Sequence, residues 1–119
     1  MKKILLSLSL TLFLLSGCYK APKLTGFSQE NWQMNVDECG KEKLQEAENL
    51  VTNFSEIKGS SQNEISLLLG KPERHELFER TQKFFFYQLT CPDSAGRTQQ
   101  LRLRFDALGS LREGLVEIQ

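Results

Sequence analysis

The sequence predicts an α+β domain in which two N-terminal helices pack on one face of a three- to four-stranded antiparallel sheet. Apolar residues recur every three or four positions over residues 38–54, and a shorter helical pattern follows over residues 61–70. After Pro72 the period changes to two, which is typical of strands. Because the connections between the expected strands are short, neighbouring strands should run antiparallel.

The two helices differ in how the sequence marks them. Over residues 38–54, apolar side chains gather on one face and charged ones on the other, which we interpret as a solvated face without catalytic meaning. The second helix has start and stop signals. Ser61 and Glu64 have the spacing of a capping box, and Gly70 and Pro72 end the helix.

Four strands are expected after the helices. Their ranges are 76–80, 83–91, 100–106 and 111–118, and the second of them is rich in aromatic residues. Residues 92–96 and 106–109 contain the Pro, Asp and Gly residues that favour turns. Both turns support an antiparallel meander.

An apolar run opens the chain. Lys2 and Lys3 precede a dozen mostly apolar residues, which are too few to span a bilayer comfortably. A positive segment, an apolar segment and then small residues form the architecture of a secretory signal, which we assign to residues 1–17.

The end of this signal resembles the lipobox of bacterial lipoproteins. The sequence Leu-Ser-Gly-Cys places Cys18 where that motif carries a diacylglycerol on the thiol, and cleavage then leaves the acylated cysteine as the N-terminus. Two or three acyl chains hold a protein on a bilayer almost permanently, because each buried CH₂ contributes about 0.8 kcal/mol. Tyr19 follows instead of aspartate, so enterobacteria-like sorting implies the outer membrane. The chain is therefore predicted to be lipid-anchored there through Cys18, facing the periplasm.

The mature chain is near neutral. Lys2 and Lys3 leave with the signal, so 13 of the 15 basic side chains remain against 15 acidic ones, without a basic block. This composition argues against a nucleic-acid partner. Residues 18–37 lack sustained periodicity and are expected to form a lipidated tether, followed by the domain at 38–119. A flexible chain of this length has an end-to-end distance of about 23 Å. Its apolar residues are expected to lie against the domain or against a partner; they are Phe27, Trp32 and Met34.

Two cysteines remain after Cys18. In an oxidising periplasm, Cys39 and Cys91 are expected to pair; the alternative is two unrelated buried thiols. Closing a loop of roughly fifty residues contributes about 4 kcal/mol in the chain-entropy account.

The later sequence resembles a family of small outer-membrane lipoproteins. Residues 59–73, GSSQNEISLLLGKPE, are similar to a Gly-x-Thr-x-x-x-Val-x-x-Leu-Leu-Gly-x-Pro segment of the SmpA/OmlA, or BamE-like, family. The aromatic run at 84–89 and the run LRLRFDALGSL at 101–111 resemble its later strands. The resemblance implies the family's ααβββ fold over residues 38–119 and a periplasm-facing subunit accessory to β-barrel assembly.

A catalytic role finds little support in the sequence. His75 is the single histidine, and no second ligand lies at metal spacing from it. We therefore expect no enzyme, cofactor, metal or small-molecule substrate, and a protein of the outer membrane or periplasm as the partner. A periplasmic inhibitor, or a small lipoprotein of a secretion or conjugation apparatus, is the alternative.

Strand parity predicts where a partner would bind. If Leu101 and Leu103 face the helices, the residues between and after them lie on the opposite face. On the aromatic strand, the parity of Cys91 is assigned to the core because Cys91 has to reach Cys39. There are two alternatives to an open face: the tether covers it, or a bulge reverses the parity of the strand. The predicted partner-binding residues are Phe84, Phe86, Arg102 and Arg104.

Overall fold

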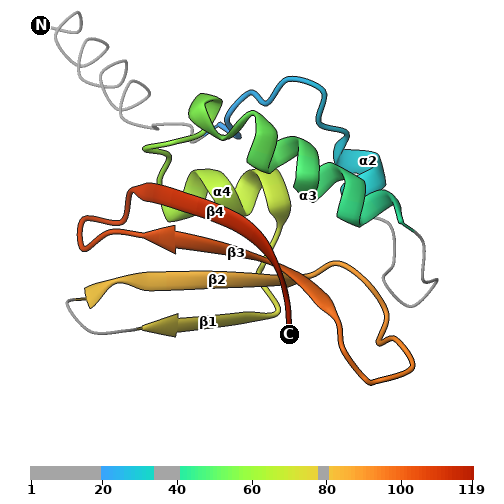
Figure 1. The fold of residues 1–119 in the computed structure, drawn as a ribbon. Helices are drawn as coiled ribbons and strands as arrows, with labels where there is room; N and C mark the ends of the chain where they lie inside the picture. The colour runs from blue at the N-terminus through green and yellow to red at the C-terminus, as the bar shows by residue number, and fades with distance from the viewer. Residues whose placement is uncertain (1–19, 34–40, 78–80) are drawn as a thin grey trace, which may run out of the picture.

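A computed structural model of the chain describes residues 20–33, 41–77 and 81–119. Helices precede a four-stranded antiparallel sheet and lie on one side of it (Figure 1), which confirms the predicted α+β class. With the labels of Figure 1, the elements are α2 (Gln29–Trp32), α3 (Glu42–Thr52), the 3-10 helix η3 (Phe54–Glu56), α4 (Gln62–Leu69), β1 (Arg74–Leu77), β2 (Lys83–Gln88), β3 (Gln99–Phe105) and β4 (Leu111–Ile118).

The capping box predicted for α4 is present. The Ser61 hydroxyl accepts the backbone N–H of Glu64 at 3.1 Å, and the Glu64 carboxylate accepts the backbone N–H of Ser61 at 3.0 Å. The helix ends at Gly70, whose φ of +81° is a conformation that side chains with a Cβ rarely adopt. None of the helices in the described ranges is long and apolar enough to cross a membrane.

The sheet is a simple meander with the strand order β1-β2-β3-β4. β4 begins and ends where the sequence predicts, whereas β1 begins two residues early. This shift arises because Arg74 already pairs with Phe86, and the Glu73 N–H donates to the Phe86 carbonyl at 3.0 Å. β2 ends before Cys91 because the Thr90 hydroxyl, not a strand carbonyl, accepts the N–H of Gln99.

A continuous apolar core lies between the helices and the sheet. The sheet contributes alternate residues, and the predicted inward parity of both central strands is confirmed. Helices α3 and α4 contribute Ala47, Leu50, Ile65, Leu68 and Leu69. The strands, with Leu89 directly after β2, contribute Phe85, Tyr87, Leu89, Leu101, Leu103, Phe105 and Leu111.

The segment expected to be a free tether is packed on the domain where it is described. Trp32 is only 1% exposed and belongs to the core, and Phe27 packs beside it at a ring distance of 5.9 Å. A short helix, α2, starts at Ser28, whose hydroxyl accepts the N–H of Asn31. Free movement from residue 18 to 37 is therefore the wrong expectation for this part, and packing on its own domain is confirmed. Met34 lies outside the described residues.

Polar contacts explain why α2 stays in place. The last carbonyls of a helix lack intrahelical donors, and at the end of α4 other elements supply them. The Trp32 indole N–H donates to the Leu69 carbonyl at 2.8 Å, and the Gln29 amide donates to the Leu68 carbonyl at 3.2 Å. The Tyr87 hydroxyl donates to the Gly70 carbonyl at 2.9 Å.

Candidate partner-binding face

The face of the sheet turned away from the helices carries the four predicted residues. Register places Phe86 opposite Arg102 and Phe84 opposite Arg104, so the two central strands bring these residues together. Arg74 lies opposite Phe86 on the other side, which adds a residue that the sequence did not predict. Phe27 and Trp32 pack with the core on the helix side, so these two residues of the N-terminal segment do not cover this face.

Two aromatic rings form the centre of this face, which we call the Phe-Arg face, made of Arg74, Phe84, Phe86, Arg102 and Arg104. The rings of Phe84 and Phe86 stack with centroids 6.3 Å apart and an angle of 19°. The guanidinium of Arg74 lies 4.2 Å from the Phe86 centroid, and that of Arg102 lies 5.7 Å from the Phe84 centroid. Cation–π contacts of this kind contribute roughly 0.5–1 kcal/mol at exposed sites.

Phe86 is more covered than its parity predicts. Its relative exposure is only 6%, although it is not part of the core on the helix side. Arg74 and Phe84 cover the ring, because long arginine stems lie along apolar surface while their charged ends stay in water. The expectation that both aromatic rings stand open is therefore wrong for Phe86, while Phe84 is half-buried.

Each arginine of this face is paired with a glutamate. Arg74 pairs with Glu76 at 3.1 Å, and Arg102 pairs with Glu117 at 3.5 Å. A third pair joins Arg104 and Glu113 at 3.3 Å. Such surface pairs contribute little stability, about 0–1 kcal/mol each. The first two pairs involve the guanidinium groups that lie over the rings. All three pairs leave the face close to neutral, so it suits a protein partner better than an anionic ligand.

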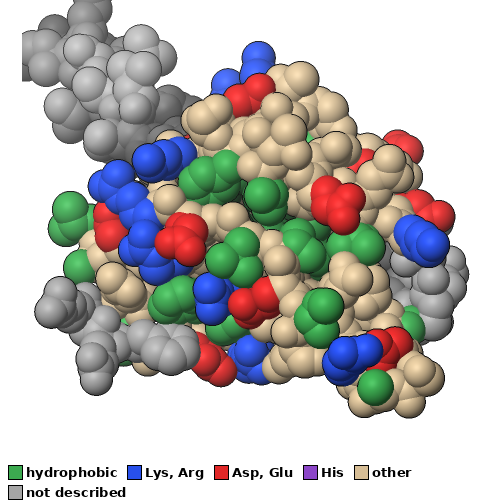
Figure 2. Space-filling model, in the orientation of Figure 1, with side chains coloured by type: hydrophobic (Ala, Val, Ile, Leu, Met, Phe, Trp, Pro, Cys, Tyr) green, Lys and Arg blue, Asp and Glu red, His purple; other side chains and the backbone are tan. Residues whose placement is uncertain are grey.

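Figure 2 shows the same character on the side of the molecule that it presents. Basic and acidic side chains lie beside apolar ones there, and several basic side chains gather at the left of the view. Mixed apolar and arginine-rich surface is typical of the centres of protein–protein interfaces.

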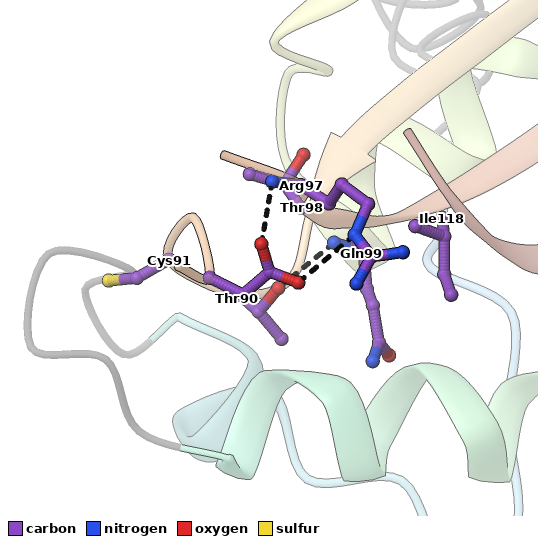
Figure 3. Close-up of a pocket in the computed structure, with 7 residues that line it drawn as sticks. Thr90, Cys91, Arg97, Thr98, Gln99 and Ile118 are labelled. Carbon is purple, nitrogen blue, oxygen red and sulfur yellow. Dashed lines mark hydrogen bonds and ion pairs between the residues drawn. The ribbon is translucent and has the colours of Figure 1, made fainter. Parts of the chain in front are cut away.

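A small hollow of about 240 Å³ lies where the loop between β2 and β3 meets the end of β4. Polar groups that line the hollow form hydrogen bonds with one another. The Asp93 carboxylate accepts the backbone N–H of Arg97 at 2.9 Å and the side-chain Nε–H of Arg97 at 3.3 Å. Hydrogen bonding holds the pKa of Asp93 below its ordinary value, and the backbone N–H of Arg97 contributes most to this. These bonds within the loop are those expected for a structural turn, and Figure 3 marks them as dashed lines.

The cysteines are only partly described. Cys91 is half-buried beside this hollow, and its sulfur points away from Thr90 and Gln99 (Figure 3). Cys18 and Cys39 lie outside the described residues, so lipidation and the pairing of Cys39 with Cys91 stay predictions. The signal at 1–17 lies outside them as well.

Groups that could suggest catalysis are dispersed. His75 is exposed on the edge strand β1, and the Glu73 carboxylate accepts the N–H of Gln88 and contacts Lys43. Within the described ranges, no group of three His, Cys, Asp or Glu residues could hold a metal ion. Burial, followed by the Glu73 charge, strongly raises the pKa of Tyr87, which therefore serves as a neutral donor to the Gly70 carbonyl.

Comparison with known proteins adds no relative. No protein-family model, no curated protein and no solved structure matches this chain.

Proposed function

We propose that this chain is a non-catalytic binding module, anchored in the outer membrane through a lipid on Cys18 and facing the periplasm. Its partner is a protein that docks on the Phe-Arg face. The observation that carries this proposal is the stacked pair of Phe84 and Phe86 under two arginines, on a sheet face without helices over it in the described part of the chain. Aromatic and arginine side chains supply most hot spots of protein interfaces.

The predicted location of the chain indicates the class of its partner. A lipobox-like Cys18 and the similarity of residues 59–73, 84–89 and 101–111 to SmpA/OmlA lipoproteins favour a role accessory to β-barrel assembly or envelope integrity. The near-neutral Phe-Arg face supports a protein partner, because its three arginines are already paired with glutamates.

The decisive experiment is crosslinking in intact membranes followed by affinity purification. The double variant Phe84→Ser with Arg104→Glu should lose the crosslinked partner, since truncating a hot spot commonly costs about 2 kcal/mol or more, about thirtyfold in affinity. Leu67→Ser with Lys71→Glu likewise replaces an apolar side chain by serine and reverses one positive charge, at two exposed residues away from the Phe-Arg face, and should keep the partner.

Circular dichroism checks that both double variants fold. If the Phe84 variant does not fold, Arg74→Ala replaces it, because Arg74 covers Phe86 from the exposed strand β1. Unchanged crosslinking in a folded variant would place the partner elsewhere. Recovery of a soluble hydrolase, without barrel-assembly subunits, would establish that the chain is an inhibitor. Recovery of secretion or conjugation subunits would establish that the chain belongs to such an apparatus.

Lipidation at Cys18 can be tested separately from partner binding. Cys18→Ser removes the thiol that would carry the lipid, so the chain should accumulate as an unprocessed precursor or as a soluble periplasmic form. Fractionation of the variant with the outer membrane, as for the unchanged chain, would contradict the lipoprotein assignment.

A further inference from the structure

We propose that one end of the domain rests on the bilayer and that the docked N-terminal segment sets this orientation. This end, which we call the basal end, consists of residues 20–25, residues 53–59 and the turn at residues 106–110. The proposal rests on the lipid of Cys18 and adds to it a defined surface that meets the membrane.

Only a short stretch of chain separates the folded domain from Cys18. Leu24 already packs against the core, so only six residue steps separate it from Cys18. A fully extended chain covers at most about 3.5 Å per residue, which gives about 21 Å in total. The basal end therefore cannot move far from the lipid anchor.

Hydrogen bonds hold the N-terminal segment against the domain. The Glu56 carboxylate accepts the backbone N–H of Thr25 at 2.7 Å, and the Asn53 amide donates to the Thr25 carbonyl at 3.1 Å. Further along, the backbone N–H of Ser28 donates to the buried carboxylate of Glu46 at 2.8 Å. The point where the chain leaves the domain toward Cys18 is thus fixed beside η3.

An exposed apolar residue lies at the basal end. Leu108, at the tip of the turn between β3 and β4, is 90% exposed. This turn lies next to the loop after η3, because Leu111 exchanges two backbone hydrogen bonds of 2.8 Å with Gly59 and Ser60. Figure 1 shows the start of the described chain, η3 and this turn at the same end of the molecule.

Charge at the basal end fits an anionic lipid surface. Lys20, Lys23 and Lys58 are exposed, and none of them forms an ion pair within the described part of the chain. The neighbouring acids are engaged, because Glu56 accepts the Thr25 N–H and Asp106 pairs with Arg112 at 2.6 Å. Each lysine near such a surface contributes about 1 kcal/mol of attraction.

This orientation explains how a partner would reach the Phe-Arg face. β4 begins at the basal end and runs away from it, and eight residues of a strand cover roughly 26 Å. The strands would then stand on the membrane, with the Phe-Arg face turned sideways toward other proteins of the same membrane.

The test measures how deeply two matched positions enter the bilayer. The full mature chain, purified with its lipid, is reconstituted in vesicles of phosphatidylcholine and phosphatidylserine with brominated acyl chains, which quench tryptophan fluorescence. Leu108→Trp is compared with Ile118→Trp, an exposed apolar position at the far end of β4. After subtraction of the signal of buried Trp32, quenching at position 108 should be at least twice that at position 118.

The outcomes separate this proposal from the anchor itself. Mass spectrometry of the N-terminal peptide that shows no lipid on Cys18 overturns the anchor, and the orientation with it. A lipidated chain with equal or stronger quenching at position 118 overturns the orientation alone.

A second measurement tests the lysines. Lys23→Glu with Lys58→Glu, in the Leu108→Trp chain, should reduce quenching to the level seen with phosphatidylcholine alone. The matched pair Lys41→Glu with Lys71→Glu changes two exposed lysines away from the basal end and should leave the quenching unchanged. No effect of the first pair, or an equal effect of the second, overturns the contact with anionic headgroups.

Discussion

At the scale of single residues, Trp32 joins the N-terminal segment to both layers of the domain. Its indole N–H bonds the last turn of α4, and its ring meets Tyr87 of β2 edge-on at a centroid distance of 5.5 Å. The Lys43 ammonium lies 4.8 Å from the ring centroid. One side chain therefore links α2, α3, α4 and the sheet.

Replacing Trp32 should separate packing from hydrogen bonding. Trp32→Ala should lower the free energy of unfolding by about 3–5 kcal/mol, because it leaves a cavity in the core. Trp32→Phe keeps a ring but leaves the buried Leu69 carbonyl without its donor, which should cost about 1–3 kcal/mol. Urea unfolding followed by circular dichroism measures both values. Asn31→Ala, at an exposed neighbour, is the control, and an equally large effect there would contradict the assignment.

Asp106 gives the turn between β3 and β4 a dependence on pH. Its carboxylate accepts the backbone N–H groups of Ser110 and Leu108 and pairs with Arg112. The Ser110 N–H, followed by the Arg112 side chain, holds the pKa of Asp106 below its ordinary value. Because the pKa is lowered by folding, this stabilisation is complete above the unfolded pKa of about 3.9 and disappears as the pH falls through the folded value.

Asp106→Asn should therefore destabilise the domain at neutral pH and have a shrinking effect in acid. The amide keeps an acceptor oxygen but loses the charge that Arg112 and the backbone N–H groups favour. Urea unfolding of both chains between pH 2 and pH 7 checks this, and a difference that stays constant down to pH 2 would show that the charge is unimportant.

At the scale of elements, β4 approaches the 3-10 helix η3 at Gly114. A Cβ atom on this residue would lie 2.9 Å from Cδ2 of Leu103 and 3.2 Å from Cε2 of Phe54. Leu103 is fully buried in the core and has little room to move. The missing side chain at position 114 therefore allows the strand to lie close to the helix layer.

Gly114→Ala should lower the free energy of unfolding by about 1–3 kcal/mol through overpacking. Phe54→Leu provides space on the helix side, so the same alanine should cost less in that background. A double-mutant cycle measured by urea unfolding reports the difference as a coupling energy. Additive effects of the two changes would show that Phe54 is not the obstacle.

The sequence contains the local signals of these elements but not every tertiary contact. The capping box at Ser61 and the alternation of β3 are local patterns, and both are confirmed. Helix α2 has only four residues and no apolar periodicity, so a local pattern does not predict it. Its position depends on the tertiary hydrogen bond from the Trp32 indole to the Leu69 carbonyl. The cover over Phe86 depends equally on Arg74 of a neighbouring strand, which no pattern within one strand reveals.

At the scale of the whole molecule, the sheet separates two kinds of surface. One face is closed by helices and the docked N-terminal segment, and the other presents aromatic rings held under arginines. Because residues 24–32 belong to the folded unit, a lipid on Cys18 would be mechanically coupled to the domain. A freely swivelling domain would present its Phe-Arg face in every direction, whereas the proposed anchor would restrict it.

The predicted staple between Cys39 and Cys91 acts at the same scale, because it would tie the segment before α3 to the loop after β2. A chain exported to an oxidising compartment forms such bonds, and closing a loop of about fifty residues contributes about 4 kcal/mol. Non-reducing peptide mapping should find these two cysteines joined, and reduction should lower the free energy of unfolding by an amount of that order. Cys18→Ser, which leaves both cysteines in place, serves as the matched control and should unfold like the unchanged chain. Complete alkylation of both thiols in the native, unreduced protein would rule the staple out.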